Sequence, residues 1–240
     1  MDKLIELNAD VGEGGPDDVL MPQVDRVSIA CGAHTGDEAS MRQALTQARE
    51  SGVMAGAHPG YPDRANFGRK PLEAAPKDIT RWVFEQTAQL QDVASSLGMT
   101  LFHVKPHGAL YNQAAVDKGV AEGVIEALLG LKGLALIALA GSPLVDWARA
   151  AGLLVLEEAF ADRRYLRDGQ LAPRHLPGAV IHEPDQAARQ ALAIARGEVV
   201  EALDGGALFI RAQTLCLHGD DPGALKRAEA VASALRGSRI

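Results

Sequence analysis

The stretch Ser51-Gly52-Val53-Met54-Ala55-Gly56-Ala57-His58-Pro59-Gly60 contains the pattern from which the fold can be predicted. A helical segment ends at a glycine, a short apolar run follows, and a histidine with Pro-Gly behind it closes the run. The step from glycine into an apolar run recurs at Leu97-Gly98-Met99 and at Ala151-Gly152-Leu153. Because glycine just past the last turn is a common helix stop, each repeat indicates a helix that leads directly into a strand.

Short apolar runs and longer helical patterns alternate along the whole chain. We expect strands at 4–7, 27–30, 53–57, 101–104, 134–140 and 153–156, and a last one formed by 207–210 with 214–217 after it. We expect helices at 37–50, 76–97, 114–129, 143–150, 184–195 and 222–235. This alternation with short loops predicts an α/β fold with a mainly parallel sheet. Both a doubly wound open sheet and a (β/α) barrel fit, and both place functional residues at the carboxyl ends of the strands.

Length and composition limit the class of protein. A chain of 240 residues predicts one domain, 1–240, and 47% hydrophobic residues with only 4% aromatics predict a core of Ala, Val, Leu and Ile. The net charge of −7 and the lack of a dense Lys/Arg run argue against nucleic acid and anionic membranes as partners. No signal peptide or membrane-spanning run is visible, so a cytoplasmic protein is expected. The two cysteines, Cys31 and Cys216, exclude a disulfide framework and are expected to be buried.

Histidines gather in or just after the apolar runs. This group comprises His34, His58, His103, His107 and His218. A buried histidine needs polar partners, so structure alone explains several such positions poorly. Because the carboxyl ends of parallel strands meet at one end of the sheet, we expect these side chains to share an active site.

Acidic residues accompany the histidines, at Asp10, Glu13, Asp37, Asp63, Glu158, Asp162 and Asp220. A carboxylate beside an imidazole can fix its tautomer, act as a general base or hold a metal. Helix capping explains Asp37 equally well, and a turn explains Asp63. A divalent metal held by Asp and His from separate strand ends stays open as an alternative.

Lys105 lies directly at a strand end, where packing explains a lysine poorly. An ammonium group there can neutralise a carboxylate or a phosphate of a substrate. Arg69, Arg163 and Arg164 follow in loops of the same face, and Arg163 is the strongest functional candidate of the three. The polar stretch 162–178 is rich in Arg and Pro, and we interpret it as an ordered functional loop. The sequence has no phosphate loop, dinucleotide fingerprint or serine nucleophile elbow, so these residues identify neither nucleotide nor serine chemistry.

The strand-end segments together resemble the LamB/YcsF family, the A component of bacterial 5-oxoprolinase. The matching segments run in family order through 7–13, 30–37, 56–63, 67–69, 104–112, 160–165 and 216–220. The chain departs from the family pattern at Asn66-Phe67-Gly68-Arg69-Lys70, where the family usually has Gly-Phe-Gly-Arg-Arg. It also has a shorter, acidic segment after Glu13. These departures concern local loop contacts.

The resemblance implies a fold and an activity. The fold is a (β/α) barrel, distorted to seven strands and similar to the polysaccharide-deacetylase barrels. The activity is the ATP-dependent opening of the lactam 5-oxo-L-proline to L-glutamate, with ATP as cofactor and subunits B and C as partners.

A set of residue roles follows as a hypothesis. Asp10 or Glu13, with His58, activates water, and Lys105 and Arg163 hold anionic groups. His34, His107 and His218 orient or protonate the reacting groups. The remaining expected substrate contacts are Asn8, Asp37, Arg69, Tyr111, Asn112, Asp162 and Asp220.

The sequence is also compatible with two other functions. One is a metal-dependent deacetylase or amidohydrolase that acts alone, and the other is a non-enzymatic protein that binds a lactam or a carbohydrate for a larger assembly. The sequence leaves open which component binds ATP, and it leaves open the oligomeric state, a homo-oligomer included.

Overall fold

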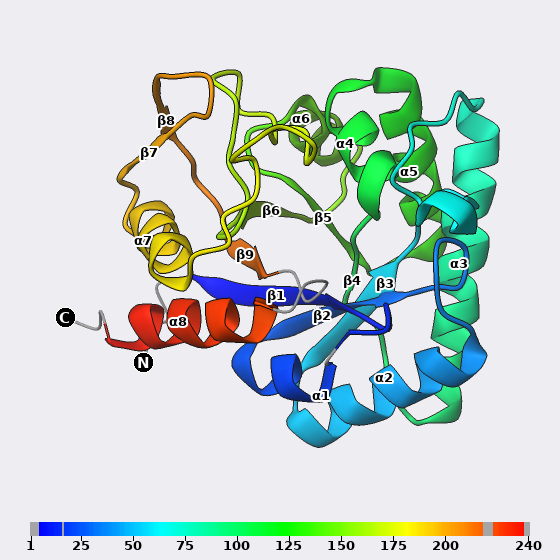
Figure 1. The fold of residues 1–240 in the computed structure, drawn as a ribbon. Helices are drawn as coiled ribbons and strands as arrows, with labels where there is room; N and C mark the ends of the chain where they lie inside the picture. The colour runs from blue at the N-terminus through cyan, green and yellow to red at the C-terminus, as the bar shows by residue number, and fades with distance from the viewer. Residues whose placement is uncertain (1–4, 16, 218–222, 238–240) are drawn as a thin grey trace.

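A computed structural model describes residues 5–15, 17–217 and 223–237. Within these ranges seven parallel strands close into a barrel in the order β1-β2-β3-β4-β5-β6-β9, with β9 paired to β1 (Figure 1). The closed sheet confirms the barrel over the open sheet. The barrel strands are β1 (Glu6–Val11), β2 (Arg26–Ala30), β3 (Met54–His58), β4 (His103–Val104), β5 (Ala135–Leu139), β6 (Val155–Phe160) and β9 (Thr214–Leu217).

Helices surround the barrel and cover its outer face (Figure 1). The α-helices are α1 (Asp17–Leu20), α2 (Glu38–Ser51), α3 (Pro76–Ser96), α4 (Gly108–Val116), α5 (Lys118–Leu131), α6 (Pro143–Ala150), α7 (Pro184–Ala195) and α8 (Ala224–Gly237). Two 3₁₀ turns, η1 (Met21–Gln23) and η2 (Arg64–Asn66), lie between these helices and strands. As predicted, alanine, valine, leucine and isoleucine dominate the buried core. None of the helices in the described ranges combines the length and apolarity needed to cross a bilayer.

The prediction that 207–210 and 214–217 form one barrel strand was wrong. Only β9 lies in the barrel, whereas β8 (Ala207–Phe209) pairs antiparallel with β7 (Val199–Glu201) in a separate two-stranded sheet (Figure 1). Burial separates the two runs, because all four residues of β9 are buried while the Phe209 side chain is 72% exposed. An apolar run alone does not reveal which face will be covered.

The predicted helix 114–129 is two helices. α4 ends at Val116 and α5 begins at Lys118, and Asp117 between them has an extended backbone (φ −94°, ψ 116°). The Asp117 carboxylate accepts hydrogen bonds from the backbone N–H groups of Gly119 and Val120. Asp117 therefore caps α5, and this capping outweighs the continuous helical pattern.

Two strands extend further than the apolar runs predicted. β1 continues through Val11 instead of ending at Leu7, so Asn8 and Asp10 lie within the strand. β6 runs from Val155 to Phe160, so Glu158 is a strand residue as well. Side chains alternate along a strand, and these polar residues take the alternate positions that face the barrel interior.

His103 fills the barrel interior and is wholly buried. Its Nε2 lies 3.2 Å from the Ser28 hydroxyl oxygen, and burial lowers the pKa of the ring to about 3. Gly56 on the neighbouring strand makes room for the ring, because a Cβ at this position would overlap the imidazole. A histidine within an apolar run thus contributes to packing here instead of to the active site.

Gly56→Ala should destabilise the fold by about 1–3 kcal/mol, because the added methyl overfills a closed interior. Urea unfolding checks this prediction, and adding His103→Ala to the variant should recover part of the loss. Gly237→Ala, at a position with open space around it, is the matched control and should leave the unfolding midpoint nearly unchanged. A Gly56→Ala protein as stable as the original would contradict this packing.

Acid should weaken the fold through His103. The unfolded chain takes up a proton as the pH falls below about 6.5, whereas folded His103 stays neutral down to about pH 3. Stability is therefore lost as the pH falls below about 6.5, by about 2 kcal/mol between pH 7 and pH 5 for this residue. Urea unfolding at both pH values should show a smaller loss for His103→Gln than for the original protein by about that amount. Equal losses of stability in the two proteins would show that His103 does not cause this acid sensitivity.

Candidate active site

Lys105 lies at the end of β4, and its ammonium group is buried among side chains of three other barrel strands: Asn8 and Asp10 of β1, Glu158 of β6, and Cys216 of β9, whose Sγ is 3.2 Å from Nζ. Nζ is 2.9 Å from Asp10 Oδ1 and 2.8 Å from Glu158 Oε1, and it donates a hydrogen bond to Asn8 Oδ1 at 3.3 Å. Burial alone would lower the pKa of Lys105, but the Asp10 and Glu158 carboxylates hold it well above its usual value. Lys105 is therefore a permanent positive charge, and it links β1 and β6 across the barrel.

Beside this charge, Glu13 meets three histidines. Glu13 Oε1 lies 3.0 Å from His34 Nε2, 3.2 Å from His107 Nδ1 and 3.7 Å from His58 Nε2. Burial would raise the pKa of the Glu13 carboxyl, but hydrogen bonds with His107 and His34 hold it well below its usual range. The carboxylate is therefore charged at neutral pH.

The three histidines have different pKa values. Burial lowers the pKa of His34 to about 4 and also lowers that of His107, so both rings are neutral at pH 7. For His58, burial also favours the neutral ring, but the charges of Asp10 and Glu13 outweigh it and raise the pKa. The cluster thus contains imidazoles suited to opposite proton-transfer roles.

Glycines near these histidines allow the loops to approach closely. Gly68 has φ +61°, and a Cβ there would lie 2.9 Å from His34 Cβ. Gly108 has φ +56°, and a Cβ there would lie 2.7 Å from the Gly68 carbonyl oxygen. Glycine adopts such conformations with the least strain, and a larger residue would also clash here. Sterics therefore explain why glycine follows His107.

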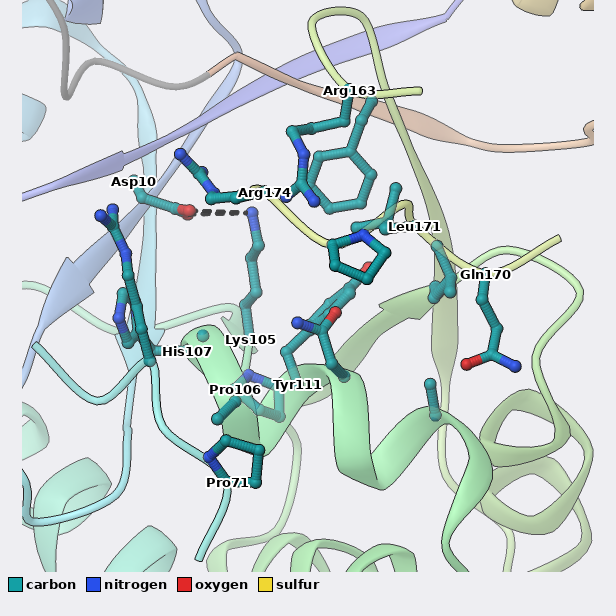
Figure 2. A pocket seen from close by; sticks show the side chains of 18 of the residues that line it. Asp10, Pro71, Lys105, Pro106, His107, Tyr111, Arg163, Gln170, Leu171 and Arg174 are labelled. Carbon is teal, nitrogen blue, oxygen red and sulfur yellow. Dashed lines mark hydrogen bonds and ion pairs between the residues drawn. The ribbon is translucent and has the colours of Figure 1, made fainter. Parts of the chain in front are cut away.

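These groups lie at the floor of a cavity of about 560 Å³. Figure 2 shows Lys105 rising toward Asp10, with Arg163, Gln170 and Leu171 across the cavity. The opposite wall comes from the loop that follows β6, which confirms that the polar stretch 162–178 is ordered against this site. The residues of this loop that line the cavity are Arg163, Gln170, Leu171, Pro173, Arg174 and His175.

The wall of the cavity is cationic. Burial and the charge of Arg174 lower the pKa of Arg163 to about 10, so the guanidinium is still charged at neutral pH. Arg69 lines the cavity from the loop after η2. Several cations around one cavity suit an anionic ligand, such as a carboxylate or a phosphoryl group.

The structure brings most of the predicted site residues together. Those that line the cavity are Asp10, Glu13, His58, Arg69, Lys105, His107, Tyr111, Asn112 and Arg163. His34 and Asn8 lie behind this lining, in contact with Glu13 and Lys105 respectively. His218 and Asp220 lie outside the described residues.

Besides Asn8, two predicted substrate contacts, Asp37 and Asp162, are not among the cavity-lining residues. Asp37 is the N-cap of α2, where its carboxylate accepts the Ser40 N–H at 2.9 Å in a capping box. The structure therefore supports the alternative explanation of this residue, helix capping. Asp162 is buried, and its Oδ2 lies 3.9 Å from Arg227 Nη2 on α8.

Sequence reasoning gives no role to Glu158, Arg174 or His175. The sequence identifies Glu158 only as an acidic residue near a strand end, and its place inside β6 depends on where the strand stops. A signal for Arg174 and His175 is present in the polar, Arg-rich loop 162–178. A loop's composition shows that it is unusual, but it does not show which side chains turn inward.

The fold and the site define a parallel (β/α)-barrel protein with carboxylates, imidazoles and an ammonium group at the carboxyl ends of its strands. Residues 5–240 match the LamB/YcsF family. The chain belongs to this family.

Named relatives and a solved structure are similar to this chain over nearly its whole length. The chain is 46% identical to the 5-oxoprolinase A component of Chloroflexus aggregans and 44% identical to that of Syntrophobacter fumaroxidans, covering 98% of this chain and 96% of each relative. The crystal structure of the lactam utilization protein from Thermus thermophilus is 42% identical, with a TM-score of 0.91 over 98% of this chain and 96% of that one.

Lys105→Met should destabilise the fold by about 3–5 kcal/mol, because the Asp10 and Glu158 carboxylates lose their shared buried cation. Adding Glu158→Gln should recover part of this loss in urea unfolding, because one of the unbalanced charges is removed. Arg167→Met is the control, since it breaks an exposed pair with Asp204 and should cost under about 1 kcal/mol. Strictly additive losses in the double variant would contradict this account of Lys105.

Proposed function

We propose that this chain is the A component of an ATP-dependent 5-oxoprolinase, which opens 5-oxo-L-proline to L-glutamate together with subunits B and C. The observation that carries the proposal is the pairing within one cavity of a carboxylate–imidazole floor with a cationic wall. Relatives that are more than 40% identical over nearly their whole length, and that are named as this component of 5-oxoprolinase, support the choice of substrate.

The chemistry requires both parts of the cavity. A lactam is a stable amide, and transfer of the γ-phosphoryl group of ATP to its oxygen turns the ring carbon into a better electrophile. Water then adds to that carbon, and the ring C–N bond breaks as the nitrogen takes up a proton, which leaves the acyl phosphate of glutamate. A second water molecule cleaves this acyl phosphate, so the products are glutamate, phosphate and ADP. A base must take the proton of the water, and cations must hold the phosphoryl group and the substrate carboxylate.

The side chains supply these functions as follows. Asp10 or Glu13, with His58, accepts the proton of the attacking water from the floor of the cavity. Lys105 and Arg163 neutralise the anionic groups, and Arg69 lies where it can assist them. Tyr111 and Asn112 on α4 line the cavity and are suited to contact the substrate.

ATP binding is assigned to the assembled enzyme rather than to a residue of this chain. The sequence contains no Gly-x-x-x-x-Gly-Lys-Ser/Thr phosphate loop. The cationic wall formed by Arg69, Arg163 and Arg174 is the part of this chain suited to a transferring phosphoryl group. The partner subunits are therefore part of the proposal.

The test is glutamate release from 5-oxo-L-proline by the reconstituted three-component complex, with and without ATP. Turnover should require ATP and all three components, and Asp10→Asn should abolish it while the complex still assembles. Asp78→Asn, on the outer helix α3 and away from the cavity, is the matched control and should turn over normally. Near-normal turnover by Asp10→Asn would reject the role of this carboxylate.

The same assay separates the two other functions. Glutamate release by this chain alone, without ATP, would identify an amidohydrolase that acts by itself. Lactam binding without turnover in the complete, ATP-supplied complex would identify a non-enzymatic binding protein. Either result would overturn the proposed activity.

A further inference from the structure

Two buried histidines at the floor of the cavity have one ring nitrogen committed to the main chain. His58 Nδ1 lies 2.7 Å from the Lys105 carbonyl oxygen, and His107 Nε2 lies 2.9 Å from the Phe67 carbonyl oxygen. A carbonyl oxygen only accepts, so each ring donates its N–H there. The neutral form of each ring therefore carries a bare lone pair on the other nitrogen, His58 Nε2 or His107 Nδ1.

These two bare nitrogens face one another, 3.0 Å apart. Two carboxylates join them, since Glu13 Oε1 lies 3.2 Å from His107 Nδ1 and Asp10 Oδ2 lies 3.4 Å from His58 Nε2. Four groups that accept and do not donate thus converge on one small volume. Such an arrangement is repulsive unless a cation lies among them.

Charge counting favours an added cation of more than one unit. With both rings neutral, as metal ligands must be, the carboxylates of Asp10 and Glu13 give the four groups a charge of −2, and the neighbouring Glu158 carboxylate and Lys105 ammonium cancel each other. His58 and His107 are 1% and 5% exposed, so water screens this charge poorly. A divalent ion would balance it.

We propose that Asp10, Glu13, His58 and His107 form a binding site for one divalent transition-metal ion of the zinc class. Ligands about 2.1 Å from a shared ion lie about 3.0 Å apart at a right angle and about 3.4 Å apart at the tetrahedral angle. The separations of 3.0, 3.2 and 3.4 Å match this range, and the 3.7 Å between Glu13 Oε1 and His58 Nε2 exceeds it by 0.3 Å. Two imidazoles with two carboxylates suit zinc, manganese, cobalt or iron, and histidine ligands commonly donate their other N–H to a main-chain carbonyl.

His34 has a different place in this site. Glu13, His34 and His107 also offer ligand atoms within 4.8 Å of one another. The rings of His34 and His107 are stacked, however, with centroids 3.7 Å apart and planes 1° from parallel, so their lone pairs run side by side and do not converge. The His58 ring is at 89° to the His107 ring, which allows convergence. His34 therefore orients Glu13 through the 3.0 Å hydrogen bond from Nε2.

An ion bound here would supply an acidified water molecule at the cavity floor. The four ligand side chains would hold the ion beside Lys105, on the side of the cavity opposite the cationic wall. The inference stands apart from the lactam reaction, because metal binding is measured on this chain alone and without ATP, substrate or partner subunits.

The experiment uses the untagged full chain, freed of metal with a chelator and then titrated with Zn²⁺ and with Co²⁺. Elemental analysis after desalting should give one ion per chain, and Co²⁺ should produce a visible absorption band typical of nitrogen and oxygen ligands. His107→Gln and His58→Gln should each weaken binding at least 100-fold. His34→Gln should weaken it less, by about 10- to 100-fold, as expected for a residue that orients a ligand.

His182→Gln, at an exposed position just before α7 and not among the cavity-lining residues, is the matched control and should bind like the original chain. Circular dichroism and the unfolding midpoint of each variant separate lost binding from lost folding. Failure of the folded chain to retain a stoichiometric ion would overturn the proposal and would leave a shared proton as the cation of the cluster. Unchanged affinity in a folded His58→Gln or His107→Gln variant would overturn it as well.

Discussion

The buried ammonium group of Lys105 is the interaction on which the rest of the site depends. It ties Asp10 on β1 to Glu158 on β6 from its own place at the end of β4, across the interior of the barrel. Buried charges are tolerated only when they are paired, so these three residues must be placed together or not at all. The closed sheet meets this condition because its strands bring their carboxyl ends to one rim.

Around Lys105 and its two carboxylate partners, the site consists of two parts that come from different segments of the chain. The carboxylate–imidazole floor belongs to the strand ends and to the tight loops after them, where glycines such as Gly68 and Gly108 permit close approach. The cationic wall belongs mainly to the long loop after β6, with Arg163 and Arg174, and Arg69 joins it from the loop after η2. The floor is suited to moving protons and the wall to holding anions, and lactam opening with ATP requires both.

Much of this arrangement could be predicted from the sequence, because the rule that parallel strands present their carboxyl ends together needs only the order of strands and polar residues. That order alone places Asp10, His58, Lys105 and His107 in one site. The same order lists Glu158 among the acidic residues near the strand ends but gives it no particular role, although it is one of the two carboxylates paired with Lys105. Its partner across the barrel becomes clear only in the structure.

Other differences arise from local hydrogen bonds and from burial, which a hydrophobic pattern does not encode. Asp117 divides one helical pattern into two helices, and Asp37 caps α2 instead of entering the cavity. His103 follows the strand-end pattern of the other histidines, yet it packs against Gly56 in the barrel interior. The stacked rings of His34 and His107 likewise determine which imidazoles can converge, and no spacing in the sequence reveals their orientation.

We propose that the lactam is opened in the cavity between Lys105 and Arg163. A crystal structure of the chain soaked with 5-oxo-L-proline tests this placement. We expect the lactam in this cavity, with its carboxylate on the Arg163 side and its ring carbonyl facing the floor formed by Asp10, Glu13 and His58. A lactam bound elsewhere on a chain whose complex is active would contradict this placement.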